Sequence, residues 1–93
     1  MSDPQQTARL FQALSVDKRV RIVQLLAEGP LCVGELAERL GISPGAVSQH
    51  LRVLRDAGLV RAERRGYFIH YHQNAGAVAG LKAYLDELLK PPS

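Results

Sequence analysis

Apolar side chains recur at helical spacing in five segments of the chain. In residues 33–40 they stand at positions 33, 36, 37 and 40, the spacing of one buried helical face. The other four segments are residues 5–14, about 16–27, 44–57 and 74–89. Ser15 is placed to cap the second helix, which is apolar on more than one side and is therefore expected at the centre of the fold.

A short break separates the helix at 33–40 from the helix at 44–57. Gly41 supplies the left-handed residue that commonly ends a helix. Ser43 can cap the next helix, and Pro44 suits its first turn because the N–H that proline lacks would have no partner there. Two helices joined by a short turn that contains glycine form a helix-turn-helix, whose second helix enters the DNA major groove.

The helix at 44–57 is expected to bury one face and to expose the other. Val47, Leu51 and Leu54 form the apolar stripe, so a small, polar and basic set points away from it: Gly45, Ser48, Gln49 and Arg52. Small residues let the backbone approach the groove, glutamine can pair with adenine, and arginine can pair with guanine. A helical hairpin with an ordinary solvated face is the alternative interpretation.

Two segments rich in β-branched and aromatic residues follow, at 59–64 and 67–73, and they flank Arg65-Gly66. This pattern predicts a β-hairpin. A hairpin at residues 60–73 that follows the DNA-reading helix at 44–57 is called a wing. Because side chains alternate along a strand, we expect Ile69 and Tyr71 on the inward face of the second strand. Such a hairpin must pack on the helices, since two strands alone are marginally stable.

The first and last helices carry more apolar surface than a small domain can bury in its own core. The set is Leu10, Phe11, Leu14, Leu81, Tyr84, Leu85 and Leu88. We therefore expect a homodimer joined through these two helices, which would place two reading helices about 34 Å apart, one turn of DNA. The alternative is a monomer in which both helices fold onto the core.

Composition favours one globular domain over residues 1–93, with 46% hydrophobic and 23% charged residues. There is no run of about 18 apolar residues and no basic-then-apolar leader, so we expect a cytoplasmic protein with no membrane association. A single cysteine, Cys32, agrees with a reducing compartment.

The net charge of +3 is concentrated in residues 51–66. That stretch holds five arginines against two acids, whereas the rest of the chain holds seven basic against seven acidic residues. Double-stranded DNA is the partner that such a basic footprint favours, although a solvated face can produce a similar run. We expect Arg64 and Arg65, at the tip of the hairpin, to meet phosphates or the neighbouring minor groove.

The sequence offers few candidates for metal-binding, redox or catalytic residues. Cys32, His70 and His72 are weak candidates for a metal or redox site; a chance histidine pair on an outward strand face and an inert buried thiol are the alternatives. His50 lies beside the buried stripe and is read as a packing or phosphate-contacting residue. The chain has no nucleophile elbow, phosphate-binding glycine loop or paired carboxylates, so we expect neither an enzyme nor a cofactor.

Several motifs stand in a fixed order along nearly the whole chain. They are residues 14–23, Glu35-Leu36-Ala37, residues 42–43 and 47–51, Leu54, residues 57–60, Gly66 and Tyr71. This order and spacing resembles the ArsR/SmtB family of bacterial winged-helix repressors. The resemblance implies a mainly α winged helix-turn-helix with the order α-α-α-α-β-β-α, dimeric through its first and last helices. It also implies an inverted-repeat operator and repression until an inducer arrives.

The sequence departs from the metal-sensing members of that family. They carry a Cys-x-Cys pair near the start of the third helix, where this chain has Cys32 but Gly34 in place of the second cysteine. One thiolate cannot complete a four-ligand zinc site. The second family site uses histidine on the last helix, and residues 74–90 contain none. We therefore expect no metal site, and the inducer, a small molecule or an oxidant, is unknown.

The prediction is a sequence-specific DNA-binding regulator that acts as a repressor. Its expected DNA-binding set is Ser43, Pro44, Gly45, Ser48, Gln49, His50, Arg52, Arg64 and Arg65. The alternatives are a winged-helix module that binds protein, and a metal- or thiol-responsive sensor.

Overall fold

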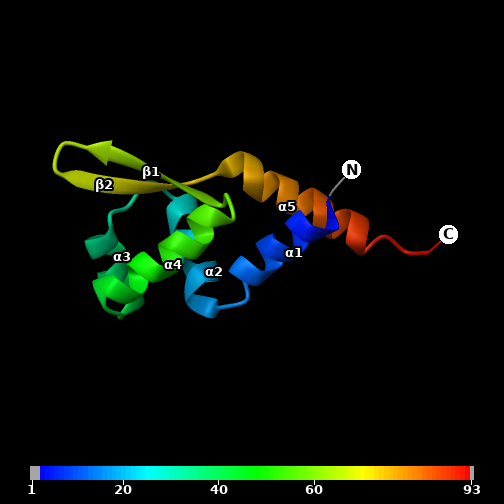
Figure 1. Cartoon of the computed structure of the whole chain (residues 1–93), viewed down its shortest axis with the longest axis horizontal. Coiled ribbons are helices and arrows are strands. Elements are labelled where there is room, and N and C mark those ends of the chain that lie inside the picture. The colour runs from blue at the N-terminus through cyan, green and yellow to red at the C-terminus, as the bar shows by residue number, and fades with distance from the viewer. Residues whose placement is uncertain (1–2, 93) are drawn as a thin grey trace.

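The computed structural model describes residues 3–92 and shows the predicted order of elements (Figure 1). These elements are α1 (Pro4–Ala13), α2 (Asp17–Ala27), α3 (Val33–Leu40), α4 (Pro44–Asp56), β1 (Val60–Arg65), β2 (Phe68–Gln73) and α5 (Ala75–Leu88). The prediction of one domain over 1–93 includes residues 1, 2 and 93, which lie outside the described residues.

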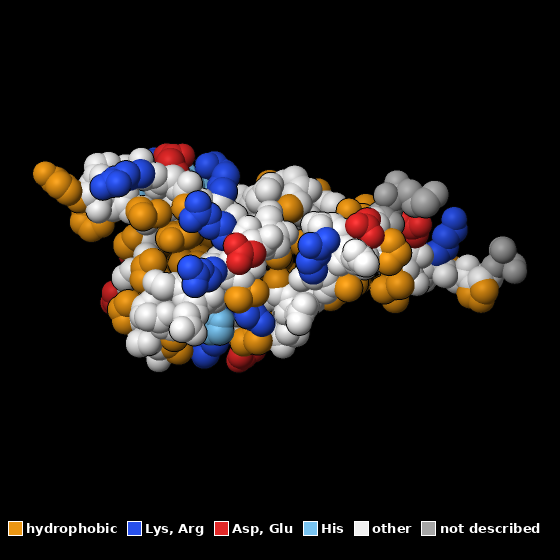
Figure 2. Space-filling model, viewed as in Figure 1, with side chains coloured by type: hydrophobic (Ala, Val, Ile, Leu, Met, Phe, Trp, Pro, Cys, Tyr) orange, Lys and Arg blue, Asp and Glu red, His pale blue; other side chains and the backbone are white. Residues whose placement is uncertain are grey.

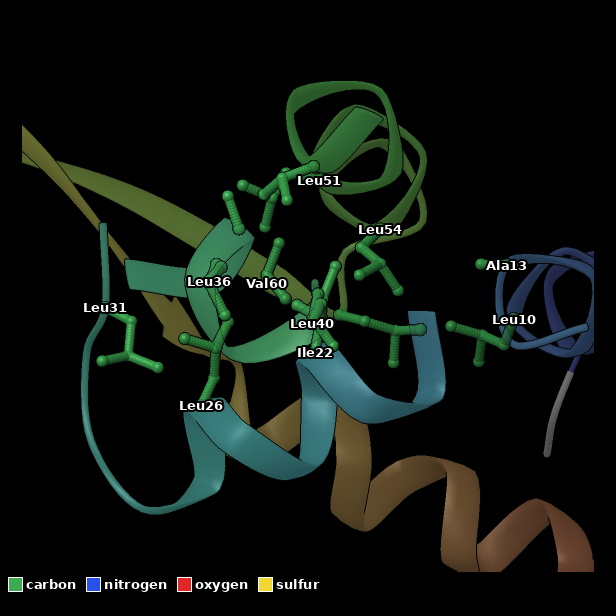
Figure 3. Close-up of a cluster of buried hydrophobic side chains, with 13 residues drawn as sticks. Leu10, Ala13, Ile22, Leu26, Leu31, Leu36, Leu40, Leu51, Leu54 and Val60 are labelled. Carbon is green, nitrogen blue, oxygen red and sulfur yellow. The ribbon is translucent and has the colours of Figure 1, made fainter. Parts of the chain in front are cut away.

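The core fills the space among α2, α3, α4 and the start of β1, and Leu10 and Ala13 of α1 extend it (Figure 3). Its largest fully buried side chains are Ile22, Leu36, Val47, Leu51, Leu54 and Leu59. Each such side chain contributes about 1.5–3 kcal/mol through its removal from water. The helix expected at the centre, α2, packs against α3, α4 and β2.

The second helix begins differently from the prediction. Val16 occupies the position before α2 and makes no side-chain capping bond. The expected cap, Ser15, instead donates its hydroxyl to the carbonyl oxygen of Gln12 at 2.7 Å. Its hydroxyl therefore satisfies a carbonyl at the end of α1, where the last carbonyl groups lack helical partners, and the prediction for Ser15 is wrong.

The hairpin pairs its two strands in antiparallel register, with Ala62 opposite Tyr71 and Arg65 opposite Phe68. Its two-residue turn is therefore Gly66-Tyr67, one position later than predicted. Gly66 has a φ of +62°, a conformation that glycine adopts without steric cost. On the other edge of β2, Leu31 and Tyr71 exchange backbone hydrogen bonds of 3.2 and 2.8 Å, which tie the hairpin to the segment before α3.

The inward face of the hairpin reaches the core only at its base. Tyr71 packs against the core as expected, and the Gln73 amide donates to the Val23 carbonyl oxygen at 3.0 Å. Ile69 is 46% exposed, so its predicted inward position is wrong. The alternation of faces was correct, but the strands extend past the helices that could cover Ile69.

The molecule is about 53 Å long, and its two ends are built from different elements. Helices α1 and α5 lie side by side at one end, whereas α3, α4 and the hairpin lie at the other (Figure 1). Within residues 3–92 no helix combines the length and the apolarity needed to cross a bilayer.

Candidate nucleic-acid interface

Local backbone chemistry fixes the start of α4. Gly41 has a φ of +67° and ends α3, as predicted. The Ser43 hydroxyl oxygen accepts a hydrogen bond from the Ala46 backbone N–H at 3.1 Å, and Pro44 occupies the first helical position. The turn between α3 and α4 is therefore short and capped, which gives α4 a fixed starting direction.

Helix α4 buries one side and exposes the other, as the sequence predicts. Val47, Leu51 and Leu54 are almost completely buried and lock the helix onto the core. The opposite side carries the exposed residues of the expected DNA-binding set: Ser43, Pro44, Gly45, Ser48, Gln49 and Arg52. Their exposure is confirmed, while their contact with DNA stays a prediction.

His50 lies at the border between these two sides of α4. It is half-buried, as expected for a residue beside the apolar stripe. A packing or phosphate-contacting role for His50 stays a prediction.

A groove runs between α4 and the second strand of the hairpin. Its walls are formed by Ser48, Gln49, Leu51, Arg52, Arg55, Asp56 and Tyr71. Arg55 was not among the predicted contact residues, although its spacing of three residues from Arg52 places both on neighbouring positions of one helical face. Figure 2 shows basic side chains on the hairpin and below it on the same face of the molecule.

The two arginines at the tip of the hairpin have different surroundings. The Arg65 Nε donates to the Glu63 Oε1 at 2.7 Å, and Arg61 lies 3.5 Å from the other carboxylate oxygen. The Arg64 Nε donates at 3.4 Å to the carbonyl oxygen of Gly66, and no carboxylate pairs with it among the described residues. Arg64 is therefore the more available cation of the predicted pair.

Glu63 is the common partner of Arg61 and Arg65 on one face of the hairpin. The hydrogen bond from Arg65 and its positive charge lower the pKa of Glu63 below its ordinary value. The carboxylate is therefore ionised throughout the neutral range. It competes with any phosphate for Arg61 and Arg65.

The candidate metal and redox residues do not form a site. No group of three or more histidine, cysteine or acidic residues within residues 3–92 is arranged to hold a metal ion. The expected outward position of the histidines is wrong. His70 is half-buried, and the His72 side chain is 15% exposed and lies against Glu63, with Nε2 3.7 Å from Oε2.

Cys32 stands at the position before α3 and is half-buried. Its backbone N–H donates to the Glu35 Oε1 at 3.0 Å, and this hydrogen bond is the main cause of a lowered pKa of Glu35. The geometry gives Cys32 a structural place at the helix start and brings no second thiol to it.

The far end of the molecule has an apolar hollow between α1 and α5. It is lined by Pro4, Thr7, Ala8, Phe11, Tyr84, Glu87 and Leu88. Leu85 and Leu88 are exposed, and Leu88 has 67% of its surface in solvent. An exposed apolar surface of this kind marks a place for contact with another molecule.

Four residues of the predicted dimer set face partly or wholly inward, and one of them, Tyr84, also lines the hollow. Leu10 is 4% exposed and belongs to the core of one chain, so its assignment to the dimer interface is corrected. Leu14 and Leu81 are half-buried and pack against that core. The surface available to a second copy therefore centres on Phe11, Tyr84 and the leucines near the end of α5.

Comparisons with known proteins agree with this geometry. The model of a family described as "Bacterial regulatory protein, arsR family" matches residues 17–62. The "HTH-type transcriptional regulator Rv2034" of Mycobacterium tuberculosis is 44% identical over 86 residues, 92% of this chain and 80% of that protein. The "Transcriptional repressor SdpR" of Bacillus subtilis is 37% identical over 65 residues, 70% of this chain and 72% of that protein.

A solved structure adds a comparison of shape. It is the solution structure of "the homodimeric winged helix-turn-helix DNA-binding domain" Mb0332 from Mycobacterium bovis, with a TM-score of 0.76 and 32% identity. The match covers 95% of this chain and 86% of that one. The whole arrangement of helices and hairpin is therefore shared.

Proposed function

The chain belongs to the ArsR family of bacterial regulatory proteins, and on that premise we propose that it represses transcription by binding an inverted-repeat operator as a homodimer. Membership makes the chain a DNA-binding transcription regulator and not an enzyme. Repression is supported by the relative named a transcriptional repressor, and dimerisation by the homodimeric domain of similar shape.

The proposed mode of DNA binding rests on one observation. The exposed side of α4 joins the groove beside β2, so small, amide and guanidinium groups form one continuous surface. Gly45 and Ser48 allow close approach to the major groove, while Gln49 and Arg52 carry the donors that read base edges. The buried stripe of α4 holds these groups in one orientation, which sequence-specific reading requires.

The wing supplies contacts that do not depend on base sequence. Arg64 lies on the same hairpin face as Tyr71, which borders the groove beside α4. Arg55 faces that groove from the helix side. Guanidinium groups at these positions neutralise phosphates on either side of the reading helix, which fixes the register of the protein on the duplex.

Dimerisation would use the end of the molecule opposite the wing. Two copies joined across the hollow of α1 and α5 would direct both reading helices outward by symmetry. Successive major grooves on one side of DNA lie about 34 Å apart, so the operator is expected to contain two half-sites about 10–10.5 base pairs apart, centre to centre.

The proposal is tested by selection of DNA from a random duplex pool with the full chain. We expect enrichment of an inverted repeat and an observed affinity that falls linearly with salt on logarithmic axes. The slope should correspond to about 0.9 per neutralised phosphate. Failure to enrich any duplex, or equal binding to all sequences at every salt concentration, would contradict operator recognition and favour the protein-binding alternative.

The proposed inducer is a small molecule or an oxidant. Operator affinity measured with and without divalent metals, and then with a thiol oxidant, tests the metal- and thiol-responsive alternative. A loss of affinity on oxidation that Cys32→Ser abolishes would assign the response to that thiol. No change under any of these conditions would favour a different small molecule or a repressor without an inducer.

A further inference from the structure

The tip of the hairpin exposes apolar side chains that nothing in residues 3–92 covers. Tyr67 is 99% exposed, Phe68 is 64% exposed, and Ile69 is 46% exposed. Figure 2 shows hydrophobic side chains at the far end of the hairpin, projecting beyond the arginines. An exposed cluster of this kind indicates contact with a partner, because it gains nothing from the chain's own packing.

The fold does not require aromatic residues at this place. The turn needs the positive φ of Gly66, and a polar residue could follow it without strain. The cross-strand partners of the apolar residues are basic: Arg65 stands opposite Phe68 and Arg64 opposite Ile69. The tip therefore combines an apolar end with positive charge directly behind it.

This combination fits the DNA minor groove. There, two rows of phosphates border a narrow space whose walls are sugar edges and whose floor is stacked bases. Apolar side chains can enter that space and part a base step, while the arginines remain at the phosphates. A purely apolar protein partner would leave Arg64 without a counter-charge, since among the described residues no carboxylate pairs with it.

The hairpin also has the length that this contact needs. Tyr71 borders the groove beside α4, and Tyr67 lies four residues farther along the hairpin. At about 3.3 Å per residue, the tip extends about 13 Å past Tyr71. The centre of the neighbouring minor groove lies half a helical turn, about 17 Å, from that of the major groove. The extended tyrosine side chain covers most of the difference.

We propose that Tyr67 and Phe68 enter the minor groove beside each half-site as an apolar wedge and bend the operator. The inference rests on the proposed function and deepens it, because part of the recognition then comes from base steps that α4 does not touch. Wedges of this kind kink DNA by about 20–90°. Flexible pyrimidine–purine steps such as TA resist the kink least and should be preferred there.

The test uses the duplex enriched by the full chain, with a dye at each end and 2-aminopurine at the flanking step. We expect binding to shorten the distance between the dyes and to raise the 2-aminopurine fluorescence. A TA step at the flank should bind about tenfold more tightly than a stiff A-tract in the same place. The variant Tyr67→Ala/Phe68→Ala should lose the bend and most of this preference but keep its discrimination within the half-sites.

Tyr67→Phe is the matched control, because it keeps the ring and should keep both the bend and the flank preference. Both exposed residues can be changed without loss of folding, which an unchanged melting temperature would verify. A second readout is nitration of Tyr67, located by mass spectrometry, which the bound duplex should suppress.

Unchanged bending and flank preference in the double alanine variant would overturn the wedge. Equal nitration of Tyr67 in the free and the DNA-bound protein would also overturn the wedge. That result is expected if the tip binds another protein and not DNA. If the full chain enriched no duplex at all, the proposed function would fail and the wedge with it. Enrichment without bending would leave the proposed function intact and reject the wedge alone.

Discussion

The side-chain amide of Asn74 donates a hydrogen bond to the backbone carbonyl oxygen of Gly58, 2.9 Å away. The amide oxygen of the same residue accepts from the Ala77 backbone N–H at 3.3 Å and so caps α5. Its own backbone N–H donates to the Leu59 carbonyl oxygen at 2.9 Å. One asparagine therefore joins the turn after α4 to the start of α5.

We predict that Asn74→Ala lowers the free energy of unfolding by about 1–3 kcal/mol, because it removes a cap and leaves a partly buried carbonyl oxygen without its donor. Urea denaturation should show a lower midpoint. Asn74→Asp is the matched control, since it keeps the capping oxygen but cannot donate to Gly58. An unchanged midpoint in the alanine variant would mean that water replaces both contacts without loss.

A second prediction concerns base reading by α4. Gln49→Ala and Arg52→Ala should each cost about 1–3 kcal/mol of discrimination at one position of the half-site, because each removes donors to a base edge. Competition binding with single-base variants of the enriched duplex measures this loss.

Gln24→Ala is the control for this experiment, since Gln24 is exposed on α2 and does not line the groove beside α4. It should leave both affinity and discrimination unchanged. If the α4 variants lost equal affinity for operator and random DNA, Gln49 and Arg52 would be phosphate contacts and not base readers.

A third prediction follows from the position of Glu63 between arginines. Glu63→Gln should raise the affinity for random DNA and steepen its salt dependence, because Arg61 and Arg65 lose their carboxylate partner and become available to phosphates. Glu28→Gln makes the same change of net charge at an exposed site at the end of α2 and should have a smaller effect. Equal effects of the two variants would mean that the Glu63→Gln effect comes from the change of net charge and not from the release of Arg61 and Arg65.

A fourth prediction is that the two arginines at the tip of the hairpin contribute differently to DNA affinity. Arg64→Ala should weaken binding to all sequences more than Arg65→Ala does, because Arg65 must give up its 2.7 Å contact with Glu63 before it can bind a phosphate. Since its pKa is lowered, Glu63 holds its charge as pH falls through the neutral range and loses it only in more acidic solution. Glu63 therefore competes with phosphates for Arg65 throughout the neutral range, and the difference between the two arginine variants should persist there.

The sequence predicted those features that depend on local chemistry. The stop at Gly41, the cap at Ser43 and the exposed side of α4 follow from residues a few positions apart, and all three are confirmed. The positions of Ile69 and His72 were wrong. Burial on a strand depends on how far the helices reach and on which side chains of the opposite strand cover it.

The hollow between α1 and α5 is lined by three residues of the predicted dimer set, Phe11, Tyr84 and Leu88, whereas Leu10 was misassigned to it and the role of the hollow in dimerisation stays a prediction. Helical periodicity identified the apolar positions of α1 without separating those that face the core from those that face outward. Leu10 and Phe11 are adjacent in sequence, yet Leu10 is in the core and Phe11 lines the exposed hollow. Only the packing of α1 on the rest of the chain distinguishes them.

The last prediction concerns that hollow. Leu88→Glu should raise the dissociation constant of the homodimer at least about tenfold, because a carboxylate would have to leave water at the centre of an apolar contact with Phe11 and Tyr84. Sedimentation equilibrium measures the shift toward monomer. Operator affinity should fall in parallel, since one protomer can bind only one half-site. Leu89→Glu is the matched control, because Leu89 is equally apolar and exposed but does not line the hollow. A Leu88→Glu protein that stays dimeric would place the interface elsewhere on the molecule.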